Sequence, residues 1–401
     1  MKMTWKRAVV GVFLFLVLFW IETSAAAEVG VTSDSVVVGC SNSFSGPLAF
    51  CGTEMVKHGI EIYFRQINEQ GGINGRKLIM KSYDDAYDPT RAVANTKRLV
   101  EEDKVFCILE PQGSSPVAAT LDYLEKQKVP LLFPFQGLPL PGRTVFTATT
   151  SYPRDAEIVI DWLVKTKGFK RIGMIYQDDQ YGSAYLDTAL KKLKGTGMEL
   201  AAQESVKRGA LDLSAQMVKL KQADLDVLWI VLVPGPGAMV LKEAKKEGWT
   251  KTKLLATGPL TDEKFIILSA GEGEGVWGFS VWPDPVHSQK PGVVEYRNLL
   301  QKYVPGHEPN RYSIFGYFFA KLFVEGLKGT GKDVTRGKLV EALEGIKNWR
   351  NDIILPVSFS KENHAAQESG FMVEVRKNVF QPISGWQSEK DGKLVESPLG
   401  E

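Results

Sequence analysis

The feature that most constrains the fold is an alternation of short apolar segments with amphipathic ones, which runs twice along the chain. Apolar runs of about five residues between glycine, proline or charged residues are typical of buried parallel strands, and the longer segments have the apolar spacing of helices. Each run, residues 35–149 and 152–282, has about the size of one α/β unit. The sequence therefore predicts an α/β protein of two Rossmann-like lobes, each with a mainly parallel sheet.

The individual elements are expected from this pattern. In the first run we predict strands at 35–39, 77–83, 105–109, 129–133 and 144–149, and helices at 53–69, from 88 and from 116. In the second run we predict strands at 171–176, 199–204, 227–233, 254–257 and 275–282, and helices at 152–167, 182–193, 213–222 and 237–247. In the tail we predict helices at 293–303, 313–328 and 335–345, and antiparallel strands at 355–359, 370–375 and 381–386.

The tail is too poor in alternating elements for a third domain. Its helices fit as additions to the first lobe and its strands as additions to the second, so the chain crosses between lobes near residues 150, 282 and 352. Three crossings form a hinge. The expected division is 1–27 as a signal peptide, 28–150 plus 283–352 as the N-terminal lobe, and 151–282 plus 353–401 as the C-terminal lobe.

The stretch from Val105 to Thr120 places a polar turn directly after an expected strand. Ser114 or Ser115 can accept a hydrogen bond from the free amides of the next helix, and Pro116 suits the first helical position. Gly113 lets the backbone come close to a bound group. Free amides and hydroxyls along a helix dipole suit a carboxylate or another small polar group, although a plain helix cap would use the same residues.

The N-terminus has the composition of an export signal. A basic start at residues 2–7 precedes an apolar run from Ala8 to Ile21, and the small residues from Ser24 to Ala27 contain an A-x-A arrangement. The apolar run is shorter than the roughly 20 residues that span a bilayer, so a cleaved signal fits better than an uncleaved anchor. We expect cleavage after Ala27 and a periplasmic mature protein.

The charge and the side-chain inventory exclude several kinds of partner. The net charge is +2 and the basic residues are scattered, so neither nucleic acid nor an acidic membrane surface is expected as a partner. There is no C-x-x-C, and the four histidines are scattered along the sequence. We therefore predict neither a metal site nor a cofactor.

The three cysteines leave two states open. Cys40 and Cys107 fall on the expected first and third strands, which are neighbours in a doubly wound sheet, so a bridge between them is conceivable. Buried free thiols fit equally well. Cys51 falls in the turn after the first strand, where it and Phe50 lead into a helix and can face a cleft.

Segments that resemble enzyme signatures lie in the wrong context. Gly326 to Asp333 nearly matches a phosphate-binding loop, but Asp333 replaces the required hydroxyl and the segment ends a helix. Asp84 and Asp85 resemble an acid/base or metal pair, but they stand at a strand end just before a helix start, which favours a structural role. With no G-x-S-x-G turn and no histidine constellation, we predict that the chain is not an enzyme.

Several motifs, taken together and in order, carry a family resemblance. They are VVVGCSNSFSGPLAFCG, INEQGGINGRKL, YDDAYDPTRAV, the central GSSP, YQDDQYG and LPVSFSKENHAAQESGFMVEV. The mature chain resembles the periplasmic leucine/isoleucine/valine-binding proteins, the solute receptors of branched-chain amino acid ABC transporters. The resemblance implies a type I periplasmic binding protein, monomeric, whose lobes close on a small solute and then dock on an inner-membrane permease.

The resemblance also implies which residues bind the solute. The family serine at the position of Ser114 contacts the amino acid, so Ser114 and Ser115, with Gln112 beside them, are the first candidates. In the turn of Phe135, Gln136 and Gly137, the family has a threonine that helps to hold the carboxylate. Gly137 replaces that threonine here, so Gln136 or backbone amides would have to substitute for it.

Two further positions follow from the same comparison of motifs. Cys51 stands where the branched-chain amino acid binders have an aromatic residue, and Tyr181 matches a tyrosine that lines the far lobe. Phe50 and Phe135 add aromatic surface near the expected mouth of the cleft.

The main departure from the family concerns the acidic residue that grips the ammonium group of the ligand, because Leu260 stands at its position. A buried ammonium without a carboxylate partner is costly. The solute is therefore expected to be an aromatic or aliphatic carboxylate, or a neutral amide, as readily as leucine, unless Asp262 or Glu263 supplies the charge. A ligand-sensing receptor subunit of the same fold stays open as an alternative to transport, and an exported enzyme is the remote third.

Overall fold

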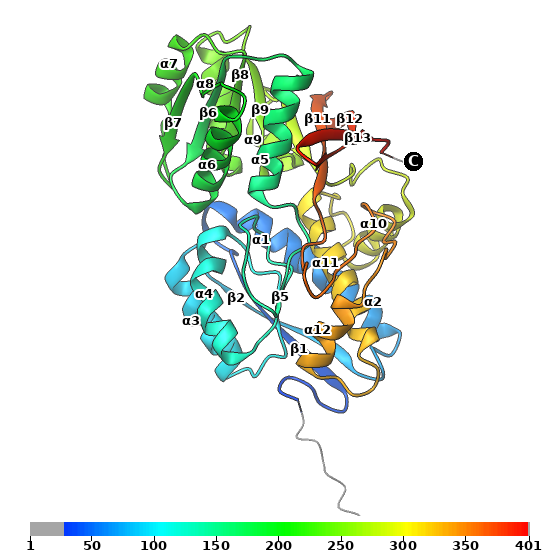
Figure 1. Cartoon of the computed structure of the whole chain (residues 1–401). Helices are drawn as coiled ribbons and strands as arrows, with labels where there is room; N and C mark the ends of the chain where they lie inside the picture. Colours follow the sequence, from blue (N-terminus) through cyan, green and yellow to red (C-terminus); the bar gives the residue numbers. More distant parts are fainter. Residues whose placement is uncertain (1–27, 400–401) are drawn as a thin grey trace, which may run out of the picture.

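The computed structural model describes residues 28–399, so the expected signal peptide lies outside the described residues. Figure 1 shows two lobes, one built around the blue and cyan strands and the other around the green ones. Among the described helices, none combines the length and apolar character needed to cross a bilayer. The molecule is a mixed α/β protein with two sheets whose central strands are parallel, as the alternation of segments predicts.

The first lobe holds a five-stranded parallel sheet in the order β2-β1-β3-β4-β5. Its strands are β1 (Ser35–Asn42), β2 (Lys77–Asp84), β3 (Ile108–Leu109), β4 (Leu131–Leu132) and β5 (Val145–Phe146). Its early helices are α1 (Ala49–Met55), a π-helical turn (Val56–Ile60), α2 (Glu61–Glu69), α3 (Pro89–Glu101) and α4 (Ser114–Gln127). The predicted elements are confirmed, although the last three strands are shorter than their apolar runs.

Three later helices complete the first lobe: α10 (Pro291–Tyr303), α11 (Arg311–Gly329) and α12 (Arg336–Glu344). Helix α11 is apolar on nearly all sides, which is typical of a helix buried on all faces, and it packs on α1, the π-helical turn and α12. Its end at Gly329 confirms that the segment from Gly326 closes a helix instead of forming a phosphate loop.

The second lobe holds an eight-stranded sheet in the order β13-β12-β11-β10-β9-β8-β6-β7. The parallel strands are β6 (Ile172–Gln177), β7 (Ala202–Val206), β8 (Val227–Val231), β9 (Lys253–Ala256) and β10 (Trp277–Ser280). The antiparallel strands are β11 (Ser369–Arg376), β12 (Val379–Lys390) and β13 (Lys393–Ser397), of which β13 was not predicted. The helices are α5 (Tyr152–Asp161) with a π-helical turn (Trp162–Thr166), α6 (Gln180–Lys194), α7 (Ser214–Gln222), α8 (Pro234–Lys246) and α9 (Glu263–Leu268).

The predicted strand at 355–359 is wrong. Val357 forms only an isolated bridge with Trp349, and the ring of Phe359 packs on Phe146 of the first lobe, with ring centroids 5.2 Å apart. The alternating apolar residues of this segment are buried against the first lobe without a strand partner. Since Ala365 also pairs with a first-lobe residue, we place the third crossing between residues 366 and 369, later than the expected boundary at 352.

The cysteines are free and buried, which resolves the choice left open by the sequence. Strand β1 pairs with β3 through Gly39 and Ile108, so Cys40 lies one residue beyond this pair and Cys107 one residue before it. The Cys40 thiol instead points to the carbonyl oxygen of Glu110, at 3.2 Å.

Candidate functional site

The candidate site is a cleft between the lobes, where the carboxyl ends of both sheets face one another. Ligands of open α/β sheets bind at this edge. The central cavity is lined by Leu48, Cys51, Tyr87, Gln112, Gly113, Ser114, Phe135, Tyr152, Tyr181, Val233, Pro234, Pro259 and Tyr312. An adjoining cavity shares Phe135, Tyr152 and Pro259 with it and extends toward Asp155, Ser280 and Trp282.

The loop that carries Cys51 into the cleft is held by Asp84 and Asp85. Asp84 accepts hydrogen bonds from the amides of Phe44 (2.9 Å) and Ser45 (3.1 Å). Partial burial would raise the pKa of Asp84, but these bonds and that of the Ser45 hydroxyl lower it to about 2. Asp85 accepts from the hydroxyl of Ser43 at 3.0 Å. The two carboxylates are bound to the loop that precedes Cys51, in agreement with the predicted structural role.

Helix α4 begins at the cleft with Gly113 as its N-cap residue. Gly113 has φ +94°, and a Cβ there would lie 2.3 Å from the Tyr87 ring, so no other residue fits. The prediction that Ser114 or Ser115 caps the helix is wrong, because no side chain caps α4 among the described residues. The first-turn amides of α4 are therefore available to a bound group, with the positive end of the helix dipole behind them.

Gln112 stands out among the described cleft residues because its side-chain amide makes no hydrogen bond. Its side chain is buried, lines the central cavity, and has no partner for either its oxygen or its nitrogen within residues 28–399. An unsatisfied buried polar group costs about 1–3 kcal/mol. The Gln136 amide, by contrast, already donates to the carbonyl oxygen of Leu138 at 3.0 Å. Of the two predicted glutamines, Gln112 is thus the one with free capacity for a solute.

Tyr152 explains why glycine stands at position 137. A Cβ on Gly137 would lie 2.3 Å from the Tyr152 ring, so this ring fills the space that a side chain at 137 would need. The Tyr152 hydroxyl accepts a hydrogen bond from Ser114 at 3.3 Å, across the lobes. Burial raises the pKa of Tyr152, so its phenol stays a neutral donor. No motif in the sequence points to Tyr152.

Other tyrosines form the remaining walls of the cleft. The Tyr181 hydroxyl hydrogen-bonds to that of Thr257 at 2.7 Å, within the second lobe. Tyr312, at the start of α11, donates to the carbonyl oxygen of Pro259 at 2.7 Å and so joins the lobes. Phe50 lies behind Tyr312, with ring centroids 6.1 Å apart, and does not line either cavity.

A latch at the rim of the cleft, formed by Arg208, Tyr87 and Ser115, also joins the lobes. The Arg208 guanidinium, from the loop after β7, donates to the hydroxyl of Ser115 at 2.9 Å and to the carbonyl oxygen of Tyr87 at 3.2 Å. It also lies over the Tyr87 ring, 4.5 Å from the centroid. Ser115 therefore contacts the opposite lobe and does not line the central cavity. The structure thus describes the lobes in contact, as in a closed state.

Leu260 does not line the cleft. It is fully buried in the second lobe, where its side chain packs against Gly237. Asp262 caps α9 by accepting from the amide of Lys264 at 2.7 Å, and it also accepts from the amide of Arg311 at 3.1 Å. Among the described residues, no acidic side chain lines the central cavity.

Asp155 is the acidic group of the adjoining cavity. One carboxylate oxygen accepts from the Tyr185 hydroxyl at 2.9 Å, and the other has no hydrogen-bond partner within the described part of the chain. Burial raises the pKa of Asp155 to about 7. An unpaired carboxylate at this place could receive a positively charged or hydroxyl group.

The chain is similar to known solute-binding proteins along almost its whole length. The family model described as "Periplasmic binding protein" matches residues 35–379. The Leu/Ile/Val-binding protein homolog 7 of Brucella abortus is 25% identical over 398 residues, covering 92% of this chain and 94% of that protein. An amino acid binding protein of Pseudomonas aeruginosa is 25% identical over 341 residues, covering 80% and 88%.

Solved structures show the same fold. A branched chain amino acid ABC transporter protein from Thermus thermophilus with bound valine has a TM-score of 0.82 at 19% identity, covering 90% of this chain and 98% of that one. A fatty acid ABC transporter substrate-binding protein from Thermomonospora curvata has a TM-score of 0.81 at 20% identity, covering 93% and 95%.

Proposed function

The chain belongs to the periplasmic binding protein family, and on that premise we propose that it is the solute-binding component of an ABC importer. It would close its two lobes on a small solute and deliver it to an inner-membrane permease. Its homologues and its fold are those of binding proteins and not of enzymes. Export by a cleaved signal peptide and a monomeric state belong to the same proposal.

The observation that carries the proposal is the unsatisfied amide of Gln112 beside the uncapped start of α4, in a cleft between two lobes. A solute that fills these hydrogen bonds and also touches Tyr181 or Pro234 contacts both lobes only when they are closed. Such a solute shifts the population toward the closed form, which is the signal that a permease can recognise.

We further propose that the solute carries a carboxylate or amide group on an apolar body. The α4 amides and the hydroxyl of Tyr152, which accepts from Ser114 and keeps its own proton free, offer hydrogen-bond donors to the polar group, and aromatic rings surround the rest. The Tyr152 hydroxyl takes the role of the hydroxyl that Gly137 lacks. No acidic side chain among the described residues faces the central cavity to pair with an α-ammonium.

A second candidate is an amino acid that extends into the adjoining cavity. The free oxygen of Asp155 supports it, because a buried carboxylate is stabilised by a neighbouring ammonium. Several homologues carry names of amino acid binders, whereas one structural neighbour is a fatty acid binder.

Calorimetric titration decides between the candidates. The mature protein, unfolded and refolded to remove carried-over ligand, is titrated with leucine, valine, aromatic carboxylates, short fatty acids and amides. Under the first candidate only solutes without an ammonium bind, and Asp155→Asn leaves their Kd unchanged. Under the second, leucine or valine binds and Asp155→Asn weakens it strongly.

Two glutamine variants test the placement of the polar group. Gln112→Leu should raise Kd at least about tenfold, because one charge-assisted hydrogen bond is worth about 1.5–3 kcal/mol. Gln136→Leu, whose amide is used inside its own loop, should change Kd little. Equal effects of the two variants would contradict the proposed site. Uptake assays with the co-expressed permease then separate transport from sensing.

A further inference from the structure

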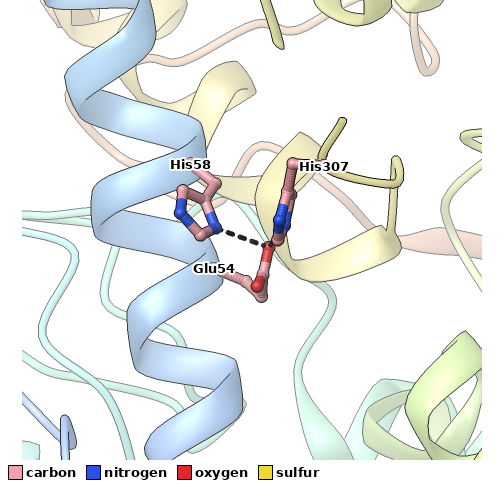
Figure 2. A group of neighbouring side chains, drawn as sticks. All are labelled: Glu54, His58 and His307. Carbon is pink, nitrogen blue, oxygen red and sulfur yellow. Dashed lines mark hydrogen bonds and ion pairs between the residues drawn. The ribbon is translucent and has the colours of Figure 1, made fainter. Parts of the chain in front are cut away.

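Two of the histidines that lie far apart in the sequence meet beside a buried carboxylate. Figure 2 shows the imidazoles of His58 and His307 turned toward Glu54. His58 Nδ1 lies 3.1 Å, and His307 Nε2 2.8 Å, from the same oxygen Oε2 of Glu54, although 253 residues separate Glu54 from His307. The prediction of no metal site rested on this separation in sequence, which the fold removes.

The local backbone brings these groups together. Glu54 lies in α1 and His58 in the π-helical turn that follows, so the two side chains are four residues apart and lie on one face of the helix. Single π-helical turns within α-helices often occur at functional sites. His307 comes from the loop between α10 and α11, and the two imidazole centroids are 4.0 Å apart.

The donor set has the chemistry of a site for a late first-row metal ion. The three ligand atoms lie within 4.8 Å of one another. In a tetrahedral site with bonds of about 2.0–2.1 Å, ligand atoms are about 3.3 Å apart, so the two distances to Glu54 need to lengthen by only a few tenths of an ångström. Two imidazoles and one carboxylate are a common ligand set for Zn²⁺ that leaves one position for water.

The surroundings support the carboxylate and give an ion access. Asn310 donates from Nδ2 to Oε2 of Glu54 at 2.7 Å, and the same residue caps α11. Hydrogen bonds of this kind orient a ligating carboxylate. Glu54 is 4% exposed, whereas His58 and His307 are 21% and 28% exposed, so the site is anchored inside and open to solvent on the imidazole side.

We propose that Glu54, His58 and His307 bind a divalent transition-metal ion of the Zn²⁺ type. In the bound state, the ring nitrogen of each imidazole that faces Glu54 gives its lone pair to the metal and the other ring nitrogen carries the proton, while Asn310 keeps its bond to Glu54. The ion would fasten α1 to the loop before α11, both in the first lobe. This site is separate from the cleft and does not depend on the solute.

The test uses the untagged mature protein, dialysed against a chelator and titrated with Co²⁺ and with Zn²⁺. We expect one ion per chain, with the visible absorption bands of tetrahedral Co²⁺, and a higher melting temperature with Zn²⁺. His58→Gln with His307→Gln, and separately Glu54→Gln, which keeps a hydrogen-bond acceptor, should weaken binding at least about tenfold.

The matched control is His287→Gln. His287 pairs with Asp284 at 2.7 Å on the surface, so it has the same ligand types without a third such residue in the described part of the chain, and its variant should bind as the wild type does. Absence of stoichiometric Co²⁺ binding by the folded wild type would overturn the proposal and leave Glu54 as a hydrogen-bonded link between helices. Loss of binding in His287→Gln alone would overturn it as well.

Discussion

The latch at the rim predicts that Arg208 sets the closing equilibrium of the lobes. Arg208→Ala removes two hydrogen bonds between the lobes, to Ser115 and to the backbone of Tyr87, and the stacking on the Tyr87 ring. Each hydrogen bond contributes about 0.5–1.5 kcal/mol and an exposed cation–π contact about 0.5–1 kcal/mol. These contributions sum to about 1.5–4 kcal/mol. Because the Arg208 side chain is 34% exposed, we take the lower part of this range, about 1.5–2 kcal/mol.

This free energy belongs to the closed form alone. When the open form predominates without solute, the loss appears in full as weaker binding, so Kd should rise about 10- to 30-fold. The assay is calorimetric titration with the best-binding solute of the panel, together with small-angle X-ray scattering of the solute-bound protein. We expect Arg208→Ala to need more solute to reach the same compact radius of gyration.

The control is Arg171→Ala. Among the described residues, the Arg171 guanidinium donates only to the carbonyl oxygens of Ala223 and Asp224, in its own lobe, so its loss should leave Kd unchanged. Arg208→Ala combined with Ser115→Ala should show a coupling energy of about 0.5–1.5 kcal/mol. A folded Arg208→Ala protein with wild-type Kd and wild-type scattering would refute the assignment of the latch.

Three further predictions concern residues in the cleft or near it. The pKa of Asp155 is about 7 in the native protein and ordinarily 3.8, so the native state binds the proton more tightly than the unfolded state. As the pH rises from 3.8 to 7, the free energy of unfolding should therefore fall by up to about 1.4 kcal/mol per pH unit. Asp155→Asn should remove that slope in urea titrations at several pH values, and an unchanged slope would exclude Asp155 as its source. Gly137→Thr should destabilise the protein by more than about 2 kcal/mol through the clash with Tyr152, and Gly137→Thr with Tyr152→Ala should melt higher than Gly137→Thr alone. Leu260→Asp should lower the free energy of unfolding by more than about 3 kcal/mol without creating leucine binding, because the carboxylate would be buried. The control Leu260→Met should lower it by less than about 1.5 kcal/mol. Leucine binding by a folded Leu260→Asp protein would show that this position faces the solute.

The fold follows from local patterns, because each strand and helix has its own apolar period and its own ends. The first strand, for example, is a run of valines that ends in a polar turn, and the structure confirms it as β1. The segment around Val357 fails for the opposite reason: its alternation looks like a strand, yet its apolar side chains are buried without a ladder partner. Alternation of apolar and polar residues indicates that one face of a segment is buried, but it does not show that the segment pairs with another strand.

The site is less readable because its geometry comes from contacts distant in sequence. Gln112 and Ser114 could be predicted as cleft residues, since they follow a strand and open a helix. Tyr152 and Tyr312 could not, because they become cleft residues only when α5 and α11 are placed beside the first sheet. The sequence shows that position 137 lacks a side chain but not why. The structure gives the reason, because the ring of Tyr152 fills the space that a side chain at Gly137 would need.

The thiol of Cys51 has a consequence for how the motion of the lobes can be observed. It lines the cleft, is 3% exposed, and burial raises its pKa to about 12, so in the closed form it holds almost no thiolate at neutral pH. Opening the lobes admits water to Cys51, whereas Cys40 and Cys107 stay inside the sheet of the first lobe. The rate at which Cys51 of the wild-type protein reacts with an alkylating reagent therefore reports how often the lobes open. A bound solute should slow this reaction, and no reporter residue has to be introduced.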